Sequence, residues 1–450
     1  SRMSNVSGVL EQRVTPCKGR GLFATRDICA GEPLLCEVPL ACTQLRPSEP
    51  GEWSTAAALA DEVLKRACED ALDHLTPSAL STAEKTLNEI NHSLVPNMPN
   101  LSPSASGAGD ASQIRAIDPE EEELQSEADQ LCRKYPGLSV ERAKRLLRVV
   151  ALNAMELRAF CGFRVQALCV RASMLNHSCS PNAIHQGFLL THDKASDSQS
   201  VEMETPEANM CLCVRSVISI RKGDEVCISY VADLTSSFSD REAELQHHGF
   251  APDRRPCDAA LDRWLVPEEM RAEKTQAIGA CNLAADAAWQ QAASASYGAE
   301  KRQYLMAAAA HSAQLLKLSS SIDPFHQLST LARSRLAHVM TASAVPRSCA
   351  NALPLWKAVL CALRQCMPPA WPQLLPPLDG AYRAASIAGM EADAASFRAE
   401  RERVVAILQH SCADVSHGKW MPVGASVLLD PRRHLAHAAG LPSGKVKVEA

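Results

Sequence analysis

The sequence changes its pattern near Cys257, and this change constrains the fold more than any other feature. Up to Tyr230, short apolar runs alternate with turn-forming residues, as is typical of strands, and stretches of helical spacing interrupt them. Beyond Cys257, almost all of the sequence has helical spacing. We therefore predict an α+β chain, with a β-rich region split by a helical insertion and then an all-helical region.

The β-rich region is predicted in pieces. Strands are expected over residues 14–42 and again over 163–230, with a polar loop at 191–200. Between them, 55–90 and 131–160 have helical patterns, and 91–109 collects Ser, Pro, Asn and Gly, as a flexible loop does. The acidic run Glu120–Glu123 is expected to open a helix, because carboxylates are favoured at helix N-termini.

Six helices are predicted in the second region, at 267–291, 299–318, 324–342, 353–366, 374–388 and 391–410. Breakers separate them, among them Pro346, the Pro-rich segment Met367–Pro377 and Gly389. The arrangement resembles stacked helical hairpins of the tetratricopeptide kind. No clear 34-residue period is present, so an ordinary helical bundle is an equal alternative.

Composition limits the classes of protein. The net charge of −5 and a pI near 6.3 argue against a broad nucleic-acid surface and favour basic partners. No apolar run is long enough to span a bilayer, and the first residues do not read as a signal peptide. The 18 cysteines include no CxxC pair and are expected to be reduced. We expect an intracellular protein of the cytoplasm or nucleus, without membrane contact or direct nucleic-acid binding.

Three motifs occur in a fixed order. The segment Ala172–Asn182 reads ASMLNHSCSPN, and packing alone does not explain its Asn-His pair followed by Ser-Cys-x-Pro-Asn. Lys18–Thr25 (KGRGLFAT) precedes it and Lys222–Tyr230 (KGDEVCISY) follows it. Together they resemble the SET-domain protein methyltransferases. Cys179, the helical second region and Asp323–His326 are similar to the SMYD branch, although no MYND zinc finger interrupts the first half.

The resemblance implies domain boundaries and a class of reaction. The expected parts are 1–48 and 166–257 for the two halves of the SET core, 49–130 for a helical insertion and loop, 131–165 for a helical SET insert, 258–430 for the tetratricopeptide-like domain and 431–450 for a tail. The cofactor would be S-adenosylmethionine, and the reaction an in-line methyl transfer to a neutral lysine amine that depends mainly on positioning. No metal is needed at the reacting centre.

The resemblance also assigns residues. Lys18, Gly19, Arg20, Gly21 and Leu22 would contact the methionyl part of the cofactor, Asn153, Asn176 and His177 would bind it further, and Phe250 would stack on adenine. Tyr230 would be catalytic and line the lysine channel, where its hydroxyl orients the amine. Each of these residues also has an ordinary structural explanation. The glycines can serve a turn, and Asn153 can be an exposed polar residue of a helix. Asn176 can be a helix cap beside a core histidine, and Tyr230 can be a core residue whose hydroxyl reaches solvent.

Two departures from the family pattern are visible. Leu245–Phe250 resembles the LxxYGF segment of the branch related to Rubisco methyltransferase, but His248 stands where a channel tyrosine is expected. No CxCxxC follows Phe250 to join Cys179 at a structural zinc. Cys257, His247 and His248 have poor spacing for a substitute site, so we predict no metal. Cys211 and Cys213 are expected to be core residues.

The main functional hypothesis is a protein-lysine N-methyltransferase acting on a basic segment of a histone or non-histone protein, with a further protein partner on the helical domain. A second hypothesis is a catalytically weak or inactive SET-fold scaffold, prompted by His248 and the missing cysteines. A third is methylation of a histidine side chain. Binding of S-adenosylmethionine and the effect of Tyr230→Phe separate the enzyme from the scaffold.

Overall fold

The computed structural model describes residues 8–15, 18–44, 54–72, 119–158, 164–189, 210–248, 251–296 and 298–409. They divide into two compact units. Among these residues, unit 1 comprises those up to Asn176 and Ala183–Ile228, and unit 2 comprises His177–Asn182 and those from Ser229 to Gln409. The chain is α+β, as predicted, and none of the described helices is long and apolar enough to cross a membrane.

Three small sheets form the β part, and the strand pairs β1–β2, β2–β10, β3–β9, β8–β9, β4–β6 and β5–β6 are antiparallel. Their strands are β1 (Leu10–Thr15), β2 (Gly19–Ala24), β3 (Pro33–Glu37), β4 (Ala41–Gln44), β5 (Ala154–Arg158), β6 (Arg164–Leu168), β7 (Asn176–His177), β8 (Ala183–Leu189), β9 (Met210–Ser216) and β10 (Glu225–Ile228). The sheet orders are β1-β2-β10-β7, β3-β9-β8 and β4-β6-β5. Each sheet thus joins segments that are far apart in the sequence.

The central strand β9 is buried along its whole length. It pairs with β3 on one side and β8 on the other. Cys211 and Cys213 are buried in it, as predicted, and Arg215 is buried with its Nη1 donating to the Gly31 carbonyl at 2.8 Å. A strand with sheet neighbours on both edges and covered faces has nearly continuous apolar sequence, which Met210–Val214 shows.

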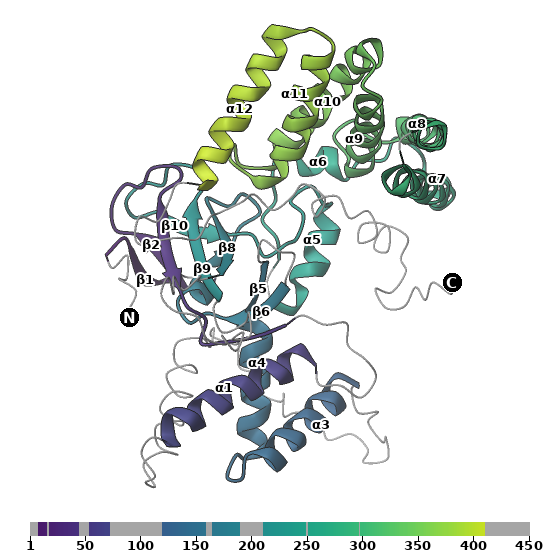
Figure 1. Ribbon diagram of the computed structural model, residues 1–450. Helices are drawn as coiled ribbons and strands as arrows, with labels where there is room; N and C mark the ends of the chain where they lie inside the picture. The colour runs from purple at the N-terminus through teal and green to yellow at the C-terminus, as the bar shows by residue number, and fades with distance from the viewer. Residues whose placement is uncertain are drawn as a thin grey trace, which may run out of the picture. The chain divides into compact units, whose positions relative to one another are not determined.

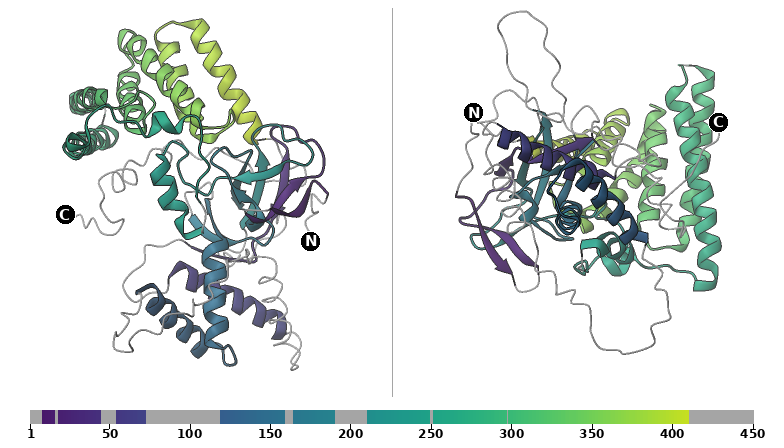
Figure 2. Two further views of the ribbon diagram at one scale, coloured as in Figure 1. Left: turned by 180° about the vertical axis from the view of Figure 1, so that it is seen from behind. Right: turned by 90° about the horizontal axis from the view of Figure 1, so that it is seen from below.

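The helical insertion of unit 1 consists of α1 (Thr55–Leu72), α3 (Pro119–Lys134) and α4 (Val140–Asn153), which lie together in Figures 1 and 2. Their apolar faces form one core. Its fully buried members include Leu59, Leu131 and Leu147. α4 begins at the N-cap Ser139, whose hydroxyl accepts the N–H of Arg142 at 3.4 Å.

One predicted helix is too long at its end. The pattern over 131–160 indicated helix throughout, but α4 ends at Asn153 and residues 154–158 form β5. β5 pairs antiparallel with β6, in a register that places Ala154 opposite Leu168 and Arg158 opposite Arg164. Sheet pairing across this hairpin supplies hydrogen bonds that a helix propensity calculation does not contain, so tertiary context prevails. The calls on 73–90, 91–109, 191–200 and the tail lie outside the described residues.

Unit 2 is helical. It contains α5 (Phe238–Leu245), α6 (Asp258–Leu261), α7 (Glu268–Ser294), α8 (Ala299–Leu318), α9 (Gln327–Ala342), α10 (Pro346–Cys366), α11 (Leu375–Ile387) and α12 (Glu391–Gln409). From α7 to α12, each helix packs against the next one (Figure 1). All six predicted helices are present, and the tetratricopeptide resemblance stays a prediction.

The start of α10 differs from the prediction. Pro346 was expected to separate two helices, but it is the first residue of α10, which begins seven positions before the predicted Leu353. Proline suits this position because the first helical residue needs no N–H donor and its φ is already helical. Pro354 lies inside the same helix. A proline therefore marks a helix start here, where the pattern indicated a break.

Candidate functional site

The glycine-rich segment Lys18–Leu22 forms the turn into β2. The backbone N–H of Lys18 donates to Thr15 Oγ1 at 3.1 Å, and the Thr15 hydroxyl donates to the Gly19 carbonyl at 3.1 Å. Gly19 has φ of 73°, in the left-handed region that favours glycine. The first glycine of the motif therefore serves the turn, and β2 runs on from it with Leu22 buried.

Gly21 is needed for a close approach of side chains. A Cβ at this position would lie 2.5 Å from Glu225 Oε1 and 2.8 Å from Asn176 Nδ2. Asn176 Nδ2 donates to the Arg20 carbonyl at 3.0 Å and to Glu225 Oε1 at 2.6 Å. Two residues of the predicted cofactor site, Gly21 and Asn176, are thus in contact within unit 1, and Glu225 joins all three motifs.

The segment that ends at Asn176 is fixed by part-buried polar contacts. The carboxylate of Glu37 accepts the N–H groups of Arg171 and Ala172, at 3.0 Å and 2.9 Å for the shorter contacts. Burial raises the pKa of Glu37, which the hydrogen bonds from these N–H groups oppose. Glu37 thereby holds the 3₁₀ turn Ala172–Met174 from which Asn176 follows.

Asn153 takes part in the same arrangement from the end of α4. Its Nδ2 donates to the Val149 carbonyl at 2.8 Å, and its own carbonyl accepts the Ser173 hydroxyl at 3.2 Å. The side-chain amide thus bonds back to a carbonyl one turn earlier in α4. The structure therefore brings Asn153 beside the segment Arg171–Asn176, with its amide nitrogen bonded within α4.

Arg20, the second residue of β2, carries a positive charge. Burial lowers the pKa of its guanidinium, which means that the surroundings penalise its positive charge. A carboxylate ligand would offset that penalty through charge-assisted hydrogen bonds. Among the residues predicted to bind the methionyl part, Lys18 and Arg20 are the two whose cationic side chains fit a carboxylate.

His177 is buried in unit 2, where both ring nitrogens have protein contacts. Its Nδ1 accepts the backbone N–H of Tyr230 at 3.0 Å, and its Nε2 lies 3.2 Å from Cys179 Sγ. Because Nδ1 accepts, a neutral ring carries its proton on Nε2, which then donates to the Cys179 sulfur. The imidazole therefore anchors the backbone of Tyr230, a role that the sequence did not indicate.

Tyr230 stands between two histidine rings. Its ring centroid lies 5.6 Å from that of His177 and 5.0 Å from that of His248, with interplanar angles of 54° and 56°. Tyr230 follows the end of β10 by two residues and is half-buried, as is His248 at the end of the 3₁₀ turn Gln246–His248. The two predicted channel residues are thus neighbours, whereas Phe250 lies outside the described residues.

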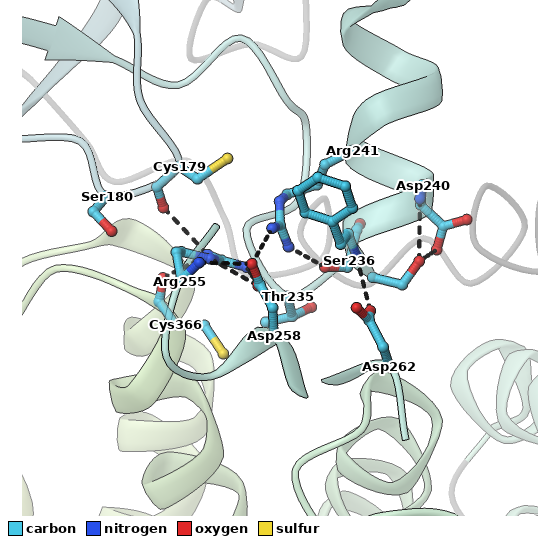
Figure 3. Close-up of polar contacts among 12 residues, drawn as sticks. Cys179, Ser180, Thr235, Ser236, Asp240, Arg241, Arg255, Asp258, Asp262 and Cys366 are labelled. Carbon is cyan, nitrogen blue, oxygen red and sulfur yellow. Dashed lines mark hydrogen bonds and ion pairs between the residues drawn. The ribbon is translucent and has the colours of Figure 1, made fainter. Parts of the chain in front are cut away.

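A buried ion cluster lies next to Cys179 in unit 2 (Figure 3). Arg241 Nη2 contacts Asp258 Oδ2 at 2.8 Å, and Arg255 Nη2 contacts Asp258 Oδ1 at 3.1 Å. Arg255 Nη1 also donates to the carbonyls of Cys179 and Cys366, each at 3.2 Å. Burial opposes ionisation of Asp258, but the hydrogen bonds from Arg241 and Arg255 and their charges outweigh it and lower the pKa of this carboxyl.

The buried ion cluster lies where the sequence raised the option of a substitute zinc site. Among the described residues, no group of three or more His, Cys, Asp or Glu side chains has the geometry to hold a metal ion. Cys179 Sγ contacts His177, and its carbonyl is bound by Arg255. Within those residues, the hydrogen bond from Arg255 to the Cys179 carbonyl connects the ion cluster to the segment around Cys179.

Sequence reasoning missed the contacts of five charged residues: Glu37, Glu225, Arg241, Arg255 and Asp258. The position of Glu225 in the sequence was a usable signal for a polar contact. Glu225 ends the KGDE turn and begins an apolar strand, and a carboxylate that becomes partly buried there needs a hydrogen-bond partner. The others are charged residues whose burial depends on segments that meet only in the fold. A sequence pattern assigns such residues to the surface.

Comparison with known proteins gives one family match. The SET domain model matches residues 19–231. No curated protein sequence matches the chain. The matched range includes the contacts of Gly21, Asn176 and Glu225 and those of His177 and Tyr230, while Lys18, His248 and Phe250 lie outside it.

Solved structures give weaker similarity. One is the SET domain of LSMT bound to lysine and AdoHcy, with 13% identity over 95% of this chain and 92% of that chain and a TM-score of 0.31. Others are that domain with methyllysine and AdoHcy (14%, 89% and 89%, 0.26) and Rubisco LSMT with sinefungin and monomethyllysine (13%, 95% and 93%, 0.26). Scores this low establish neither a shared fold nor a shared activity. The family match spans residues 19–231, and the three ordered motifs fall within it except for Lys18.

Proposed function

We propose that this protein is an S-adenosylmethionine-dependent protein-lysine N-methyltransferase. The observation that carries the proposal is the placement of Tyr230 in a SET domain, with its backbone held by His177 Nδ1 at 3.0 Å and its ring 5.0 Å from that of His248. A tyrosine fixed in this way can direct its hydroxyl at a reacting amine without being a strong base.

The residues of the first and second motifs fit the cofactor. S-adenosylmethionine supplies a methyl group on a positively charged sulfur when it is bound. Arg20 would hold its carboxylate, because a guanidinium can donate two parallel charge-assisted hydrogen bonds to a carboxylate. Lys18, Gly19, Gly21 and Leu22 would contact the methionyl part through the backbone. Asn176 would support this turn through its hydrogen bond to the Arg20 carbonyl.

The adenine end of the site is assigned to Asn153, His177 and Phe250. Both nitrogens of His177 contact protein atoms, so its contribution to the cofactor would come from the backbone. Asn153 would act in the same way, because its Nδ2 is bound to Val149. Phe250 would stack on the adenine ring.

The acceptor side consists of Tyr230 and His248. A lysine amine must lose its proton before it attacks a methyl group, and a half-buried site favours the neutral amine by desolvation. The Tyr230 hydroxyl would orient that amine. A neutral imidazole at His248 has one N–H donor and one acceptor nitrogen, so it can take a hydrogen bond that a phenol would otherwise supply.

The substrate is proposed to be a basic segment of a histone or non-histone protein. The net charge of −5 favours such a partner electrostatically. The helices of unit 2 offer a surface for a further protein partner. The SMYD-like and tetratricopeptide-like assignments belong to this proposal too.

Calorimetric titration with S-adenosylmethionine tests the cofactor first. We expect saturable binding at one site, weakened at least tenfold by Arg20→Ala and unchanged by Arg26→Ala, a matched control in the exposed turn after the same strand. Labelled methyl transfer to core histones and to a basic protein extract then tests the reaction. Tyr230→Phe should abolish labelling while cofactor binding persists. Well-folded protein without any cofactor binding would contradict the proposal.

A scaffold is the second candidate, and His248 is the observation that favours it. The resemblance places a tyrosine at this position, and a histidine there changes the acceptor channel. The variant His248→Tyr distinguishes the two: an enzyme with a working histidine loses activity or changes the number of methyl groups added, whereas a scaffold gains none. Mass spectrometry of a labelled product would separate a lysine acceptor from a histidine acceptor.

A further inference from the structure

The ring that anchors Tyr230 is itself in contact with a buried cysteine. His177 Nδ1 accepts the backbone N–H of Tyr230 at 3.0 Å, and the other ring nitrogen, Nε2, lies 3.2 Å from Cys179 Sγ. His177 is 2% exposed and Cys179 is fully buried. The orientation of the imidazole, and with it the backbone of Tyr230, therefore depends on where Cys179 lies.

Arg255 holds Cys179 through the backbone (Figure 3). Arg255 Nη1 donates to the carbonyl of Cys179 at 3.2 Å, and also to the carbonyl of Cys366 at 3.2 Å. Cys366 is the last residue of α10. One guanidinium nitrogen thus ties the segment that carries His177 to the end of a helix, and all of these residues belong to unit 2.

Asp258 sets the direction of the Arg255 guanidinium. Asp258 Oδ1 accepts Nη2 and Nε of Arg255 at 3.1 and 3.2 Å, and Oδ2 accepts the backbone N–H of Arg255 at 2.8 Å. Arg241 Nη2 donates to the same Oδ2 at 2.8 Å. A guanidinium bound to a carboxylate by two parallel hydrogen bonds has a fixed plane, so its remaining N–H groups also have fixed directions.

Stability alone does not account for this arrangement. Arg255 is 9% exposed and Asp258 is 3% exposed. A buried ion pair loses about as much hydration energy as it gains in attraction, and apolar residues of similar volume often stabilise a fold as well or better. What the ion pair supplies, and apolar packing does not, is a hydrogen-bond donor directed at the Cys179 carbonyl.

We propose that Arg255 is a positioning residue for Tyr230, which acts through Cys179 and His177, while Asp258 orients its guanidinium. The positioning is a property of unit 2 alone. Its consequence for methyl transfer rests on the proposed function, because a Tyr230 hydroxyl displaced from the reacting amine would slow the chemical step without weakening the cofactor.

Hydrogen exchange at the Tyr230 amide measures the positioning without any substrate. Arg255→Lys keeps a positive charge for Asp258 but lacks the planar fork of N–H donors, so the Cys179 carbonyl loses its donor. We expect the Tyr230 amide to exchange faster by about tenfold or more, while the amides of α9 keep their wild-type rates. Mass spectrometry with fragmentation to single residues gives these rates. Arg254→Lys, at the exposed neighbouring arginine, is the matched control and should change nothing.

A second control separates positioning from a general loss of stability. Gly380→Ala disturbs the contact of α11 with Trp356, so it should speed exchange wherever amides of unit 2 open by global unfolding, without singling out Tyr230. Faster exchange at Tyr230 in Arg255→Lys only in step with the rest of unit 2 would overturn the proposal. An unchanged Tyr230 amide in folded Arg255→Lys would do the same.

The step through the Cys179 sulfur has its own test. Cys179→Ala removes the contact with His177 Nε2 and should also speed exchange at Tyr230. Cys179→Ser supplies a hydroxyl that can accept the imidazole N–H, so it should recover part of the protection. Cys349→Ala, at another fully buried cysteine of unit 2, is the control. Wild-type protection in Cys179→Ala, or no difference between the alanine and serine variants, would contradict this route.

Kinetics then tests the consequence for the reaction. With an acceptor that the wild type methylates, Arg255→Lys should lower kcat by about tenfold or more and leave the dissociation constant for S-adenosylmethionine unchanged. Faster exchange at Tyr230 with an unchanged kcat would overturn the role of Arg255 in the reaction. A wild type that methylates no acceptor would contradict the proposed function, while the exchange rates would still decide the positioning.

Discussion

Gly21 in unit 1 and Gly380 in unit 2 both sit where an added methyl group has no space, yet their neighbours differ. At Gly21 the nearest atoms are the ends of Glu225 and Asn176, at 2.5 and 2.8 Å. At Gly380, on α11, they belong to the Trp356 ring, at 2.4 and 2.6 Å. The neighbours of Gly21 are thus the ends of flexible polar side chains. The neighbour of Gly380 is the rigid ring of Trp356, which is 2% exposed.

The difference shows how each unit uses close packing. In unit 1, hydrogen bonds among segments distant in sequence fix a turn of the proposed cofactor site, so a disturbance there should appear mainly in ligand binding. In unit 2, apolar contacts between neighbouring helices fix the fold, so a disturbance there should appear in stability. Each of the following variants tests one side of this comparison.

The largest loss of stability is expected for Asp258→Asn in unit 2. It removes the carboxylate that compensates Arg241 and Arg255, and breaking a buried ion pair costs about 4 kcal/mol. Urea unfolding followed by circular dichroism measures the change. Asp262→Asn is the control, since Asp262 is exposed and accepts only the Phe238 N–H at 2.8 Å. A loss below 1 kcal/mol would mean that the cluster is not a stabilising element.

Gly380→Ala should come next, with a loss of about 3 kcal/mol, because a methyl group against a fixed core ring forces the helices apart. The intrinsic preference of helices for alanine offsets about 1 kcal/mol of that. Thermal unfolding is the measurement. The double variant Gly380→Ala with Trp356→Phe should recover part of the loss, since phenylalanine lacks the ring atoms nearest Gly380. No recovery would point to a cause other than this contact.

Acid should destabilise unit 2 through His326, the N-cap of α9. Burial lowers the pKa of His326 to about 4, and Asp240 and Asp323 oppose the shift. The unfolded state takes up a proton near pH 6.5, where the folded state does not. Stability is therefore lost as pH falls from 6.5 towards 4, by about 2 kcal/mol at pH 5. The urea midpoint of unfolding, measured against pH, tests this, and His311→Gln is the exposed control. His326→Gln should flatten the dependence of stability on pH between 6.5 and 4. An unchanged dependence would exclude His326 as its source.

Gly21→Ala should cost the least stability, about 1 kcal/mol, because the ends of Glu225 and Asn176 can move aside. That movement breaks the contacts of Asn176 with Arg20 and Glu225, so the dissociation constant for S-adenosylmethionine should rise at least tenfold. Paired unfolding and titration experiments compare the two quantities. Strong destabilisation with intact binding would reverse the contrast between Gly21 and Gly380.

The helices and strands could be predicted because their periodicity is local. The six predicted helices of unit 2 and the strands of the three motifs agree with the sequence pattern. β5 does not, since its pairing with β6 is a tertiary contact. At the site, motif residues could be named, but not their supports. Glu37 and Glu225 contact positions more than 40 residues away, as their hydrogen bonds to Ala172 and Asn176 show. Phe250 and the domain boundaries stay predictions.

The full burial of β9 has a consequence for measurement. Its amides lie between β3 and β8 and are covered on both faces, so solvent hydrogen should reach them only when unit 1 unfolds as a whole. Their exchange with deuterium would then report the global stability of unit 1 rather than local opening. A ligand that binds the folded unit should slow them all by a common factor, even though none of them touches it.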